Sequence, residues 1–488
     1  MKTNSLDFDA QALREKILDL AMRGKLVPQD PNDEPASVLL EKIKAEKAEL
    51  IKEKKIKKTK PLPPITDDEK PFDIPDSWEW VRLGDAFEIT SSKRVMKKEW
   101  RDTGIPFYRA REIVSIKENR PLKDPIFIDE KTYADKLKVS GKPEVNDILL
   151  TGVGTLGVPY IVPKDKKFYF KDGNIIWLKN FAQINASYIS YYVQSPYMIK
   201  KINNGRGTTV ATLTIVRSNN LLVPLPPLLE QSRIAAKIAQ LFALLRKVET
   251  STQQYAKLQT LLKSKVLDLA MRGKLVKQDP NDEPASVLLE KIKAEKQELI
   301  KEKKIKKTKP LPPITDDEKP FDIPDSWEWV RCQSVTTGNF KSITPDKIKI
   351  GENLIELADI ESYSGKLINV EKITEKVGSN KYQYVKGDVL FAKLRPYLKK
   401  VVLAPNNGVC TTELLPIDGI NINNNFLYYV FTSDSFFNQI KKEMHGVNLP
   451  RVSPKKLSEL IIPLPPLLEQ NRIVANLNNV CAIIDKNI

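Results

Sequence analysis

The sequence predicts an α+β protein with a pseudo-twofold internal repeat, in which two globular α+β domains are separated by long antiparallel coiled-coil helices. Three observations support this fold class. A long segment occurs twice, a shorter segment also occurs twice, and the stretches between these repeats share a pattern of strands and helices although their sequences differ. A chain of 488 residues has room for this arrangement, since domains commonly contain about 100–200 residues.

The longer repeat is nearly a letter-for-letter copy. Residues 17–82 match residues 266–331 at a constant offset of 249 positions. The only differences are Ile17/Val266, Pro28/Lys277 and Ala48/Gln297. The shorter repeat has "LLVPLPPLLEQSRIAAKI" at 221–238 and "LIIPLPPLLEQNRIVANL" at 460–477. Two nearly identical segments imply that the chain binds two copies of the same partner. A duplication without functional meaning would explain the repeats but not the diverged sequences between them.

The two diverged inserts, about 83–220 and 332–459, have a common skeleton. Each has a β-branched strand that begins with a turn residue and Asp, and each then has an aromatic amphipathic stretch. The strands are "NDILLTG" (146–152) and "GDVLFAK" (387–393), and the aromatic stretches are 187–202 and 425–444. Mixed strands and helices indicate the α+β class. We therefore expect two domains of one fold that recognise two different targets.

The constant parts are predicted to be helical. Apolar residues follow a 4-3 spacing from Ile234 to Leu269, interrupted only at Thr252 and Gln259, as in a coiled coil. Glu230 suits the first turn and Gly273 the end of this helix, which would be roughly 65–70 Å long. Residues 467–488 repeat its first half and 10–23 its second half, so the chain ends should pack antiparallel against it.

A second helix is expected after each copy of "MRGKLV", at 35–56 and 284–305, with Pro35 or Pro284 in its first turn. Each ends in the lysine-rich "IKEKKIKKTKP". This run is either a solvated helix end or a site of phosphate contact or partner docking. A stiff, proline-rich linker then leads into the first strand of each insert.

Composition narrows the class of function. The formal charge of +17 and the pI of about 9.3 suggest a polyanionic partner, nucleic acid first. One histidine and three separated cysteines do not provide a His-based triad or a thiolate zinc site. The first residues lack the pattern of a signal peptide, and no apolar run reaches membrane-spanning length. We expect a cytoplasmic protein.

Several motifs together resemble a known family. "PLPPLLEQ-x-RI", "MRGKLV-x-QDPNDEPAS" and "FDIPDSWEWVRLGDAFEI" are similar to the specificity (S) subunit of type I restriction–modification systems (the HsdS family), over essentially the whole chain. At the entry to the second insert, "CQSVTTG" replaces "LGDAFEIT", which leaves the first strand there less certain. The family layout gives these segments: 1–82 helical region and linker, 83–223 target-recognition domain 1, 224–331 coiled coil and linker, 332–462 target-recognition domain 2, and 463–488 C-terminal helix.

The resemblance implies a non-catalytic subunit. In this family each target-recognition domain reads one half of a split double-stranded DNA site, and the constant regions bind two modification (methyltransferase) subunits. Those partners carry S-adenosylmethionine and methylate adenine, while restriction subunits add ATP- and Mg-dependent translocation and cleavage. The chain itself is then expected to bind no cofactor and no metal, and to have no catalytic residue.

Motifs for cofactor chemistry are weak or missing in the sequence. "GVGTLG" (152–157) matches the dinucleotide pattern, but Pro159 and strand-forming residues follow it where a helix is needed. We expect a glycine-rich hairpin near DNA instead. The sequence contains no G-x-x-x-x-G-K-[ST] and no N-P-P-Y-like tetrapeptide. These absences argue against a third possibility, a self-sufficient DNA methyltransferase.

Positive charge is concentrated in the inserts. The first has 23 Lys/Arg against 14 Asp/Glu, a net +9, and the second has 17 against 13, a net +4. Arginine can pair with guanine, Asn with adenine, and lysine mostly meets phosphate. The base-reading candidates are Arg94, Arg109, Arg111, Arg206, Arg395, Asn448 and Arg451. The phosphate candidates are Lys97, Lys98, Lys399 and Lys400, and Lys93, Thr208, Thr209, Lys393 and Tyr397 complete the predicted DNA-binding set.

The remaining alternative is a coiled-coil scaffold that spaces two protein-binding domains. The basic inserts favour DNA. Binding to random duplex DNA at low salt would separate the two hypotheses, because counterion release gives basic DNA-binding proteins some affinity for any duplex.

Overall fold

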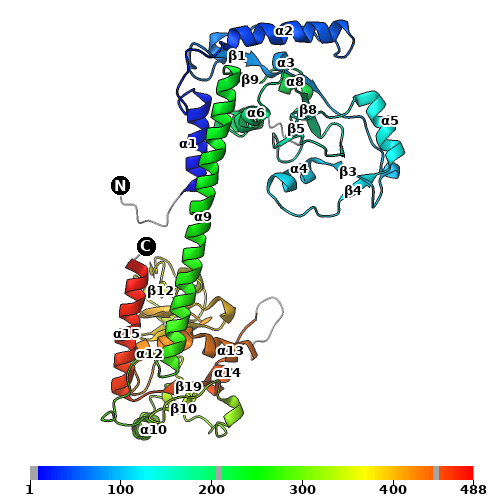
Figure 1. Cartoon of the computed structure of the whole chain (residues 1–488). Coiled ribbons are helices and arrows are strands. Elements are labelled where there is room, and N and C mark those ends of the chain that lie inside the picture. The colour runs from blue at the N-terminus through cyan, green and yellow to red at the C-terminus, as the bar shows by residue number, and fades with distance from the viewer. Residues whose placement is uncertain (1–8, 205–211, 443–449, 487–488) are drawn as a thin grey trace. The chain divides into compact units, whose positions relative to one another are not determined.

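The computed structural model describes residues 9–204, 212–442 and 450–486 (Figure 1). These residues fall into two compact units, a first unit that ends at Ser251 and a second unit that begins at Thr252. One helix, α9 (Leu228–Met271, 44 residues), belongs to both units. The predicted α+β class with an internal repeat is confirmed, since each unit contains a mixed domain and a share of this helix.

A shorter helix pairs with α9 in each unit. In the first unit, α1 (Ala10–Met22) lies beside α9, and Arg14 forms two hydrogen bonds with Glu249 (Figure 1). Leu18 and Met22 share a core cluster with Ile234 and Ile238, so the two helices run antiparallel. In the second unit, the Gln259 amide donates to the Ile484 carbonyl of α15 (Leu467–Lys486) at 3.0 Å. Ala270 and Met271 share a core cluster with Ile473 and Leu477, so these two helices also run antiparallel, and the predicted antiparallel pairing is confirmed within each unit.

In the middle of α9, the 4-3 spacing of apolar residues predicts more buried coiled-coil seam than the structure contains. Leu244, Val248, Tyr255 and Leu262 remain exposed, although Val248, Tyr255 and Leu262 lie on the 4-3 seam. The contacts with α1 extend to Glu249 and those with α15 begin at Gln259, which leaves 250–258 between them, and Val248 and Leu262 are exposed although they lie next to these contacts. The helix ends where expected, because Gly273 has a φ of +66°, a left-handed conformation that favours glycine.

The second constant helix is shorter than predicted. It spans α2 (Ala36–Lys52) in the first unit and α10 (Ala285–Lys301) in the second. Pro35 and Pro284 are the N-cap residues, one position before the first turn. The helices end at the first lysine of the lysine-rich run, and two positions later Lys54 and Lys303 have φ values of 57° and 59°, which an α-helix does not allow. The lysines therefore extend from an irregular segment.

The entry and exit of each insert are joined by a two-stranded sheet. Strand β1 (Glu79–Arg82) pairs antiparallel with β9 (Leu222–Leu225), and β10 (Glu328–Arg331) pairs with β19 (Ile461–Leu464) in the same register. Arg82 at the end of β1 and Arg331 at the end of β10 form hydrogen bonds with the proline-rich linker that precedes each strand. Each insert is therefore a module that begins and ends at one place on the constant scaffold.

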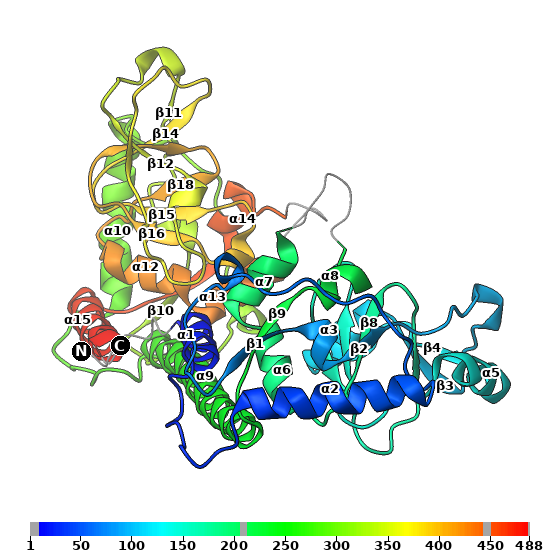
Figure 2. The same ribbon diagram turned by 90° about the horizontal axis from the view of Figure 1, so that it is seen from above.

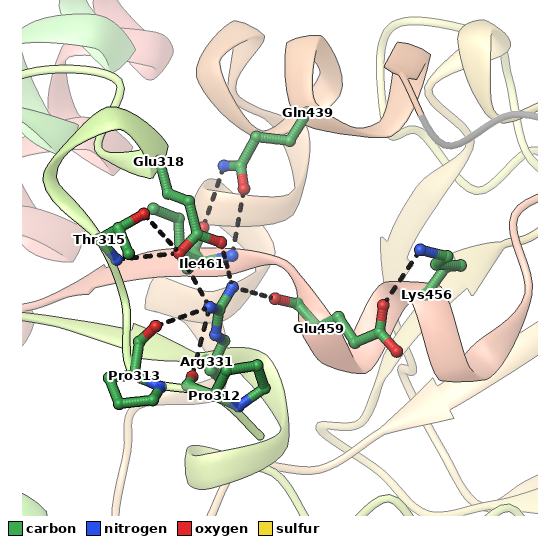
Figure 3. Close-up of polar contacts among 9 residues, drawn as sticks. All are labelled: Pro312, Pro313, Thr315, Glu318, Arg331, Gln439, Lys456, Glu459 and Ile461. Carbon is green, nitrogen blue, oxygen red and sulfur yellow. Dashed lines mark hydrogen bonds and ion pairs between the residues drawn. The ribbon is translucent and has the colours of Figure 1, made fainter.

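Figure 3 shows this anchor in the second unit. Arg331 donates to the carbonyl oxygens of Pro312 and Pro313 and bonds to Glu318, which also caps Thr315. Its guanidinium also donates to the Glu459 carbonyl at 2.9 Å, just before β19. Arg82 makes the equivalent contacts in the first unit, with Pro63, Pro64, Glu69 and the carbonyl of Asn220. The predicted stiff linker is thus held by an arginine in both units, and this arginine is buried in the first unit and half-buried in the second.

The variable domain of the first unit contains two small sheets. One has the order β2-β8-β5-β6 and the other β4-β3-β7. Their strands are β2 (Glu88–Thr90), β3 (Ile105–Tyr108), β4 (Ile126–Ile128), β5 (Ile148–Thr151), β6 (Pro159–Ile161), β7 (Tyr169–Phe170) and β8 (Ile175–Lys179). The helices are α3 (Leu83–Ala86), α4 (Ala110–Lys117), α5 (Glu130–Ser140), α6 (Ala186–Val193), α7 (Pro196–Asn203) and α8 (Ile215–Asn219).

The variable domain of the second unit repeats this plan with changes (Figure 2). Its sheets have the orders β16-β15-β18 and β11-β14-β17-β12-β13. The strands are β11 (Ser342–Ile343), β12 (Asn353–Ile355), β13 (Glu371–Lys372), β14 (Lys381–Tyr384), β15 (Val389–Ala392), β16 (Val401–Leu403), β17 (Gly408–Thr411) and β18 (Leu414–Ile417). The helices are α11 (Cys332–Val335), α12 (Asn424–Thr432), α13 (Asp434–Lys442) and α14 (Pro454–Glu459).

The predicted skeleton appears in both domains. The β-branched segments form β5 and β15, each paired with two antiparallel neighbours, and the aromatic stretches form the helix pairs α6–α7 and α12–α13. Ser195 ends one aromatic helix and caps the next, and Ser433 follows α12 and its hydroxyl accepts from Phe436 N in α13. Among the described helices, none combines the length and apolar character needed to cross a membrane.

Candidate DNA interface

A buried glutamate at the start of each coil helix joins three constant motifs. In the first unit, Glu230 accepts hydrogen bonds from the Trp78 indole at 2.9 Å and from the Gln29 amide at 2.5 Å. In the second unit, Glu469 accepts from Trp327 and Gln278 at 2.9 and 2.6 Å. Burial raises the pKa of Glu230 and of Glu469. The motifs "PLPPLLEQ", "VxQDPNDE" and "PDSWEW" therefore form one structural site, built twice.

The next residue of the motif reaches into the variable domain. Gln231 Oε1 accepts from the backbone N–H of Asn185, the N-cap of α6, and Gln470 does the same for Asn423 before α12. In the first unit the buried Tyr188 hydroxyl also donates to the carbonyl of Pro224 at 2.6 Å. Constant residues thus fix the aromatic helices of both domains in the same way.

A loop after the central strand occupies matching positions in the two domains. In the first unit, residues 152–157 connect β5 to β6, and Gly152 O accepts from Leu213 N at 2.9 Å. In the second unit, residues 393–399 connect β15 to β16, and Lys393 O accepts from Val452 N at 3.0 Å. Isolated bridges join Val153 to Thr212 and Leu394 to Arg451. We call these segments the central loops.

The central loops carry different chemistry at the same place. "GVGTLG" forms a hairpin loop between antiparallel strands, as expected, and no helix follows it. By the two matched bridges, Gly154 stands where the second domain has Arg395. Arg395 has a φ of 48° and its backbone N–H donates to Pro450 O, so the strained loop is tied to its neighbour. Arg395 and Tyr397 are exposed.

In the first domain, three arginines and the glycine loop line one groove. This hollow of about 560 Å³ is lined by Arg109, Arg111 and Arg120 and by residues 153–155. Glu112, only 2% exposed, accepts from the guanidinium groups of Arg109 and Arg111. Burial opposes ionisation of Glu112, but the hydrogen bonds from the two arginines outweigh it and lower its pKa. The acid therefore fixes both guanidinium groups at the groove.

The other predicted residues of the first domain are spread over a separate segment. Lys93, Arg94, Lys97 and Lys98 are exposed in the segment between β2 and β3, where Lys97 and Lys98 belong to a short 3-10 helix. The backbone of Lys93 is fixed by the Tyr169 hydroxyl, which accepts from its N–H and donates to its carbonyl. The structure does not place these residues in the lining of the groove. Arg206, Thr208 and Thr209 lie outside the described residues.

In the second domain, two of the predicted lysines already have partners inside the protein. Lys399 forms an ion pair with Asp434 and lies over the Phe437 ring at 4.9 Å, and Lys400 donates to the Leu357 carbonyl at 2.6 Å. Arg451 contacts Glu413 at 3.4 Å from an exposed position. Lys393 is half-buried, and Asn448 lies outside the described residues. Arg395, Tyr397 and Arg451 are the exposed members of this group.

Sequence reasoning missed Glu112, Arg120 and Glu413. The signal for Glu112 was present, since it lies three positions after Arg109 at the start of a helix, where an acid can cap the backbone. Glu413 has no comparable local signal, because its partner Arg451 lies 38 positions later in the sequence. Within the described ranges, no cluster of three His, Cys, Asp or Glu side chains is suited to a metal ion.

The two units define a protein with two α+β recognition domains of one fold on a duplicated helical scaffold. The model of the type I restriction modification DNA specificity domain matches residues 75–259 and 325–488. The chain belongs to this family.

Known relatives agree with this assignment. The specificity subunit of the type I restriction enzyme EcoAI from Escherichia coli is 33% identical, over 98% of this chain and 90% of that protein. The EcoEI specificity subunit from the same species is 35% identical, over 67% of this chain and 62% of that protein. A solved chain from work on complex assembly and conformational transition of the type I R-M system has a TM-score of 0.54 at 19% identity. It covers 85% of this chain and 93% of that chain, and it supports the fold alone.

Proposed function

We propose that this chain is the DNA-specificity subunit of a type I restriction–modification complex, and that each variable domain reads one half of a bipartite DNA site. The observation that supports this most directly is the pair of central loops. One constant scaffold presents two loops of different sequence at matching positions, which suits two readers of different half-sites. The relatives are named as specificity subunits, and both inserts are basic. The family match favours this role over a scaffold for two protein-binding domains.

For base reading we propose Arg111 and Arg120 in the first domain and Arg395 and Arg451 in the second. Arginine pairs bidentately with guanine in the major groove, and these four guanidinium groups lie beside the central loops or in them. Arg109 is less exposed than Arg111, and we propose that it lines the groove without reading a base. Lys93, Arg94, Lys97 and Lys98 would meet phosphates. Lys399 and Lys400 shape the second loop through their protein partners, and Arg206, Thr208, Thr209 and Asn448 remain proposed contacts.

For partners we propose two identical modification subunits, one on each copy of the constant region, with restriction subunits added in the full complex. S-adenosylmethionine, ATP and Mg would then be bound by those partners, and this chain would act without catalysis of its own. Exposed leucines recur in both copies at the start of the coil helices. Leu229 is 66% exposed and Leu468 is 61% exposed, and each follows a partly exposed leucine. Neighbouring exposed leucines form a small apolar patch in each copy, and exposed apolar patches can mark protein interaction sites.

The function is tested by mapping methylated adenines in DNA from cells that express this chain with its modification subunit. We expect one bipartite motif. Replacing 332–459 by the second variable domain of another family member should change one half-site and leave the other intact, because the insert begins and ends at the β10–β19 pair. A change in both halves would contradict independent reading, and unmethylated DNA with an assembled complex would contradict the function.

Partner number gives a second prediction. Replacing Leu468 with Asp should reduce the complex from two modification subunits to one, because a charge would have to be buried at that docking surface. Leu229→Asp should do the same, and the double variant should bind none. Native mass measurement of the co-expressed proteins gives the stoichiometry. The matched control is Val139→Asp, at an exposed site of α5 in a variable domain. Two bound subunits in the double variant would exclude these leucines as the contact.

A further inference from the structure

One residue before β8 and one before β18 are tied to the central loops in the same way. In the first unit, Gly152 N donates to the carbonyl of Asn174 at 2.7 Å. In the second unit, Lys393 N donates to the carbonyl of Glu413 at 3.0 Å. The strands have the same register, since the last residue of β5 pairs with the first of β8, as the last of β15 does with the first of β18. Asn174 and Glu413 therefore occupy equivalent positions beside the central loops.

The side chains at this position differ between the units, and so do their neighbours. In the second unit, the Glu413 carboxylate contacts the guanidinium of Arg451 at 3.4 Å. In the first unit, Thr212 takes the place of Arg451, because the two matched bridges join these residues to the central loops. Asn174 lines the same groove as Arg111. The matched position thus belongs to the variable recognition surface in both domains.

Local structure does not require an asparagine at position 174. The left-handed residue of this turn is Gly173, with a φ of +68°, and Asn174 itself does not have a positive φ. Within the described ranges, the Asn174 amide has no hydrogen-bond partner, so it does not stabilise the turn. The side chain is half-buried in the wall of the groove. Its donor and its acceptor are therefore available to a ligand in the groove.

The backbone around Asn174 is held from two sides. Gly173 N donates to Ser91 Oγ at 3.2 Å, and this hydroxyl donates to the carbonyl of Ile175 at 2.8 Å. The bond from the central loop to the Asn174 carbonyl fixes the turn from the other side. A side chain on a fixed backbone loses less conformational freedom when it binds, so the position is preorganised for recognition.

We propose that Asn174 is a specificity-determining residue that pairs with an adenine of the first half-site. This inference rests on the proposed function and adds one contact to it. The amide of asparagine presents one donor and one acceptor in a plane, which match N7 and the N6 amino group of adenine in the major groove. The arginines of the same groove pair with guanine instead. The groove of the first domain thus contains readers for both purines.

The test variant is Asn174→Asp, which keeps the shape of the side chain but replaces its donor with an acceptor. A carboxylate accepts from the amino group of cytosine and cannot donate to N7 of adenine. The preference for adenine over cytosine at one position of the first half-site should fall at least about tenfold. The second half-site should be read as before. The measurement is competition binding of the assembled complex to duplexes altered at one position at a time.

The matched control is Gln183→Glu, which adds the same charge at an exposed position after the other end of β8. Both variants should lose affinity for all duplexes by a similar factor, because an added negative charge opposes phosphate binding. Only Asn174→Asp should change the base preference. If Asn174→Asp does not assemble, Asn174→Ala, which only removes the amide, should lose the preference for adenine.

The outcomes separate this inference from the proposed function. An unchanged base preference in the assembled Asn174 variant, or the same change of preference in Gln183→Glu, would overturn the role of Asn174. A parent complex that assembles but prefers no sequence at either half-site would contradict the proposed function itself.

Discussion

Replacing both Arg395 and Arg451 with alanine should weaken binding to the half-site of the second variable domain by at least about 30-fold, because a bidentate arginine–guanine pair contributes about 1–3 kcal/mol of discrimination. The two residues come from segments 56 positions apart, but the bridge between Leu394 and Arg451 joins them. Preference for the first half-site should stay unchanged. The measurement is competition binding of the assembled complex to duplexes in which one half-site at a time is altered.

The control removes the same charge elsewhere in the same domain. Lys349→Ala with Lys372→Ala takes two exposed cations from the region of the five-stranded sheet, away from the central loop. This pair should lower affinity for all sequences by a similar small factor, since phosphate contacts carry no sequence information. If the control variant and the arginine variant lose the same specificity, the central loop does not read the second half-site.

The internal sequence repeats made much of the fold predictable. The repeats on both sides placed the two inserts in the same order. "NDILLTG" and "GDVLFAK" could therefore be recognised as one strand although they share few letters, and they form β5 and β15. The coil helix followed from its spacing and its terminal glycine. Its partners followed because residues 10–23 and 467–488 repeat parts of it. Periodic patterns and capping residues are local, and local features can be read from sequence.

The state of individual charges could not be read in this way. Lys399 and Lys400 looked like free cations, but each meets an acid or a carbonyl that lies elsewhere in the fold. Asp434 is 35 positions from Lys399, and no local pattern announces the pair. A sequence lists the charges, whereas tertiary contacts decide which of them remain available to DNA.

The uncertain entry to the second insert had a physical cause. "LGDAFEIT" forms α3 and then β2, with Phe87 buried before the strand, whereas "CQSVTTG" places Thr336 at the same position. Without a β2 equivalent, β18 remains the edge of its three-stranded sheet. The sequence showed the departure but not its effect on the sheet, because that effect depends on how segments about 80 positions apart come together.

Insertion of four residues after Ser251 should lengthen the unspecified gap between the two half-sites and leave both half-sites unchanged. The insertion adds about 6 Å of helix at 1.5 Å per residue, which corresponds to roughly one or two base pairs at 3.4 Å each. The site avoids the paired parts of the coil. The Arg14–Glu249 ion pair lies before it and the Gln259–Ile484 hydrogen bond lies after it. Because four residues nearly complete a turn, the apolar seam is displaced but continuous.

Genome-wide mapping of methylated adenines checks this expectation. The original sites should lose methylation and sites with the wider gap should gain it, since α9 is the continuous helix that connects the two units. The matched control replaces Thr250 and Gln253, both exposed, with alanine and should leave the gap as it was. An insertion variant that methylates the original sites would show that the length of α9 does not set the spacing. One that assembles but methylates nothing would show that the modification subunits require the original length.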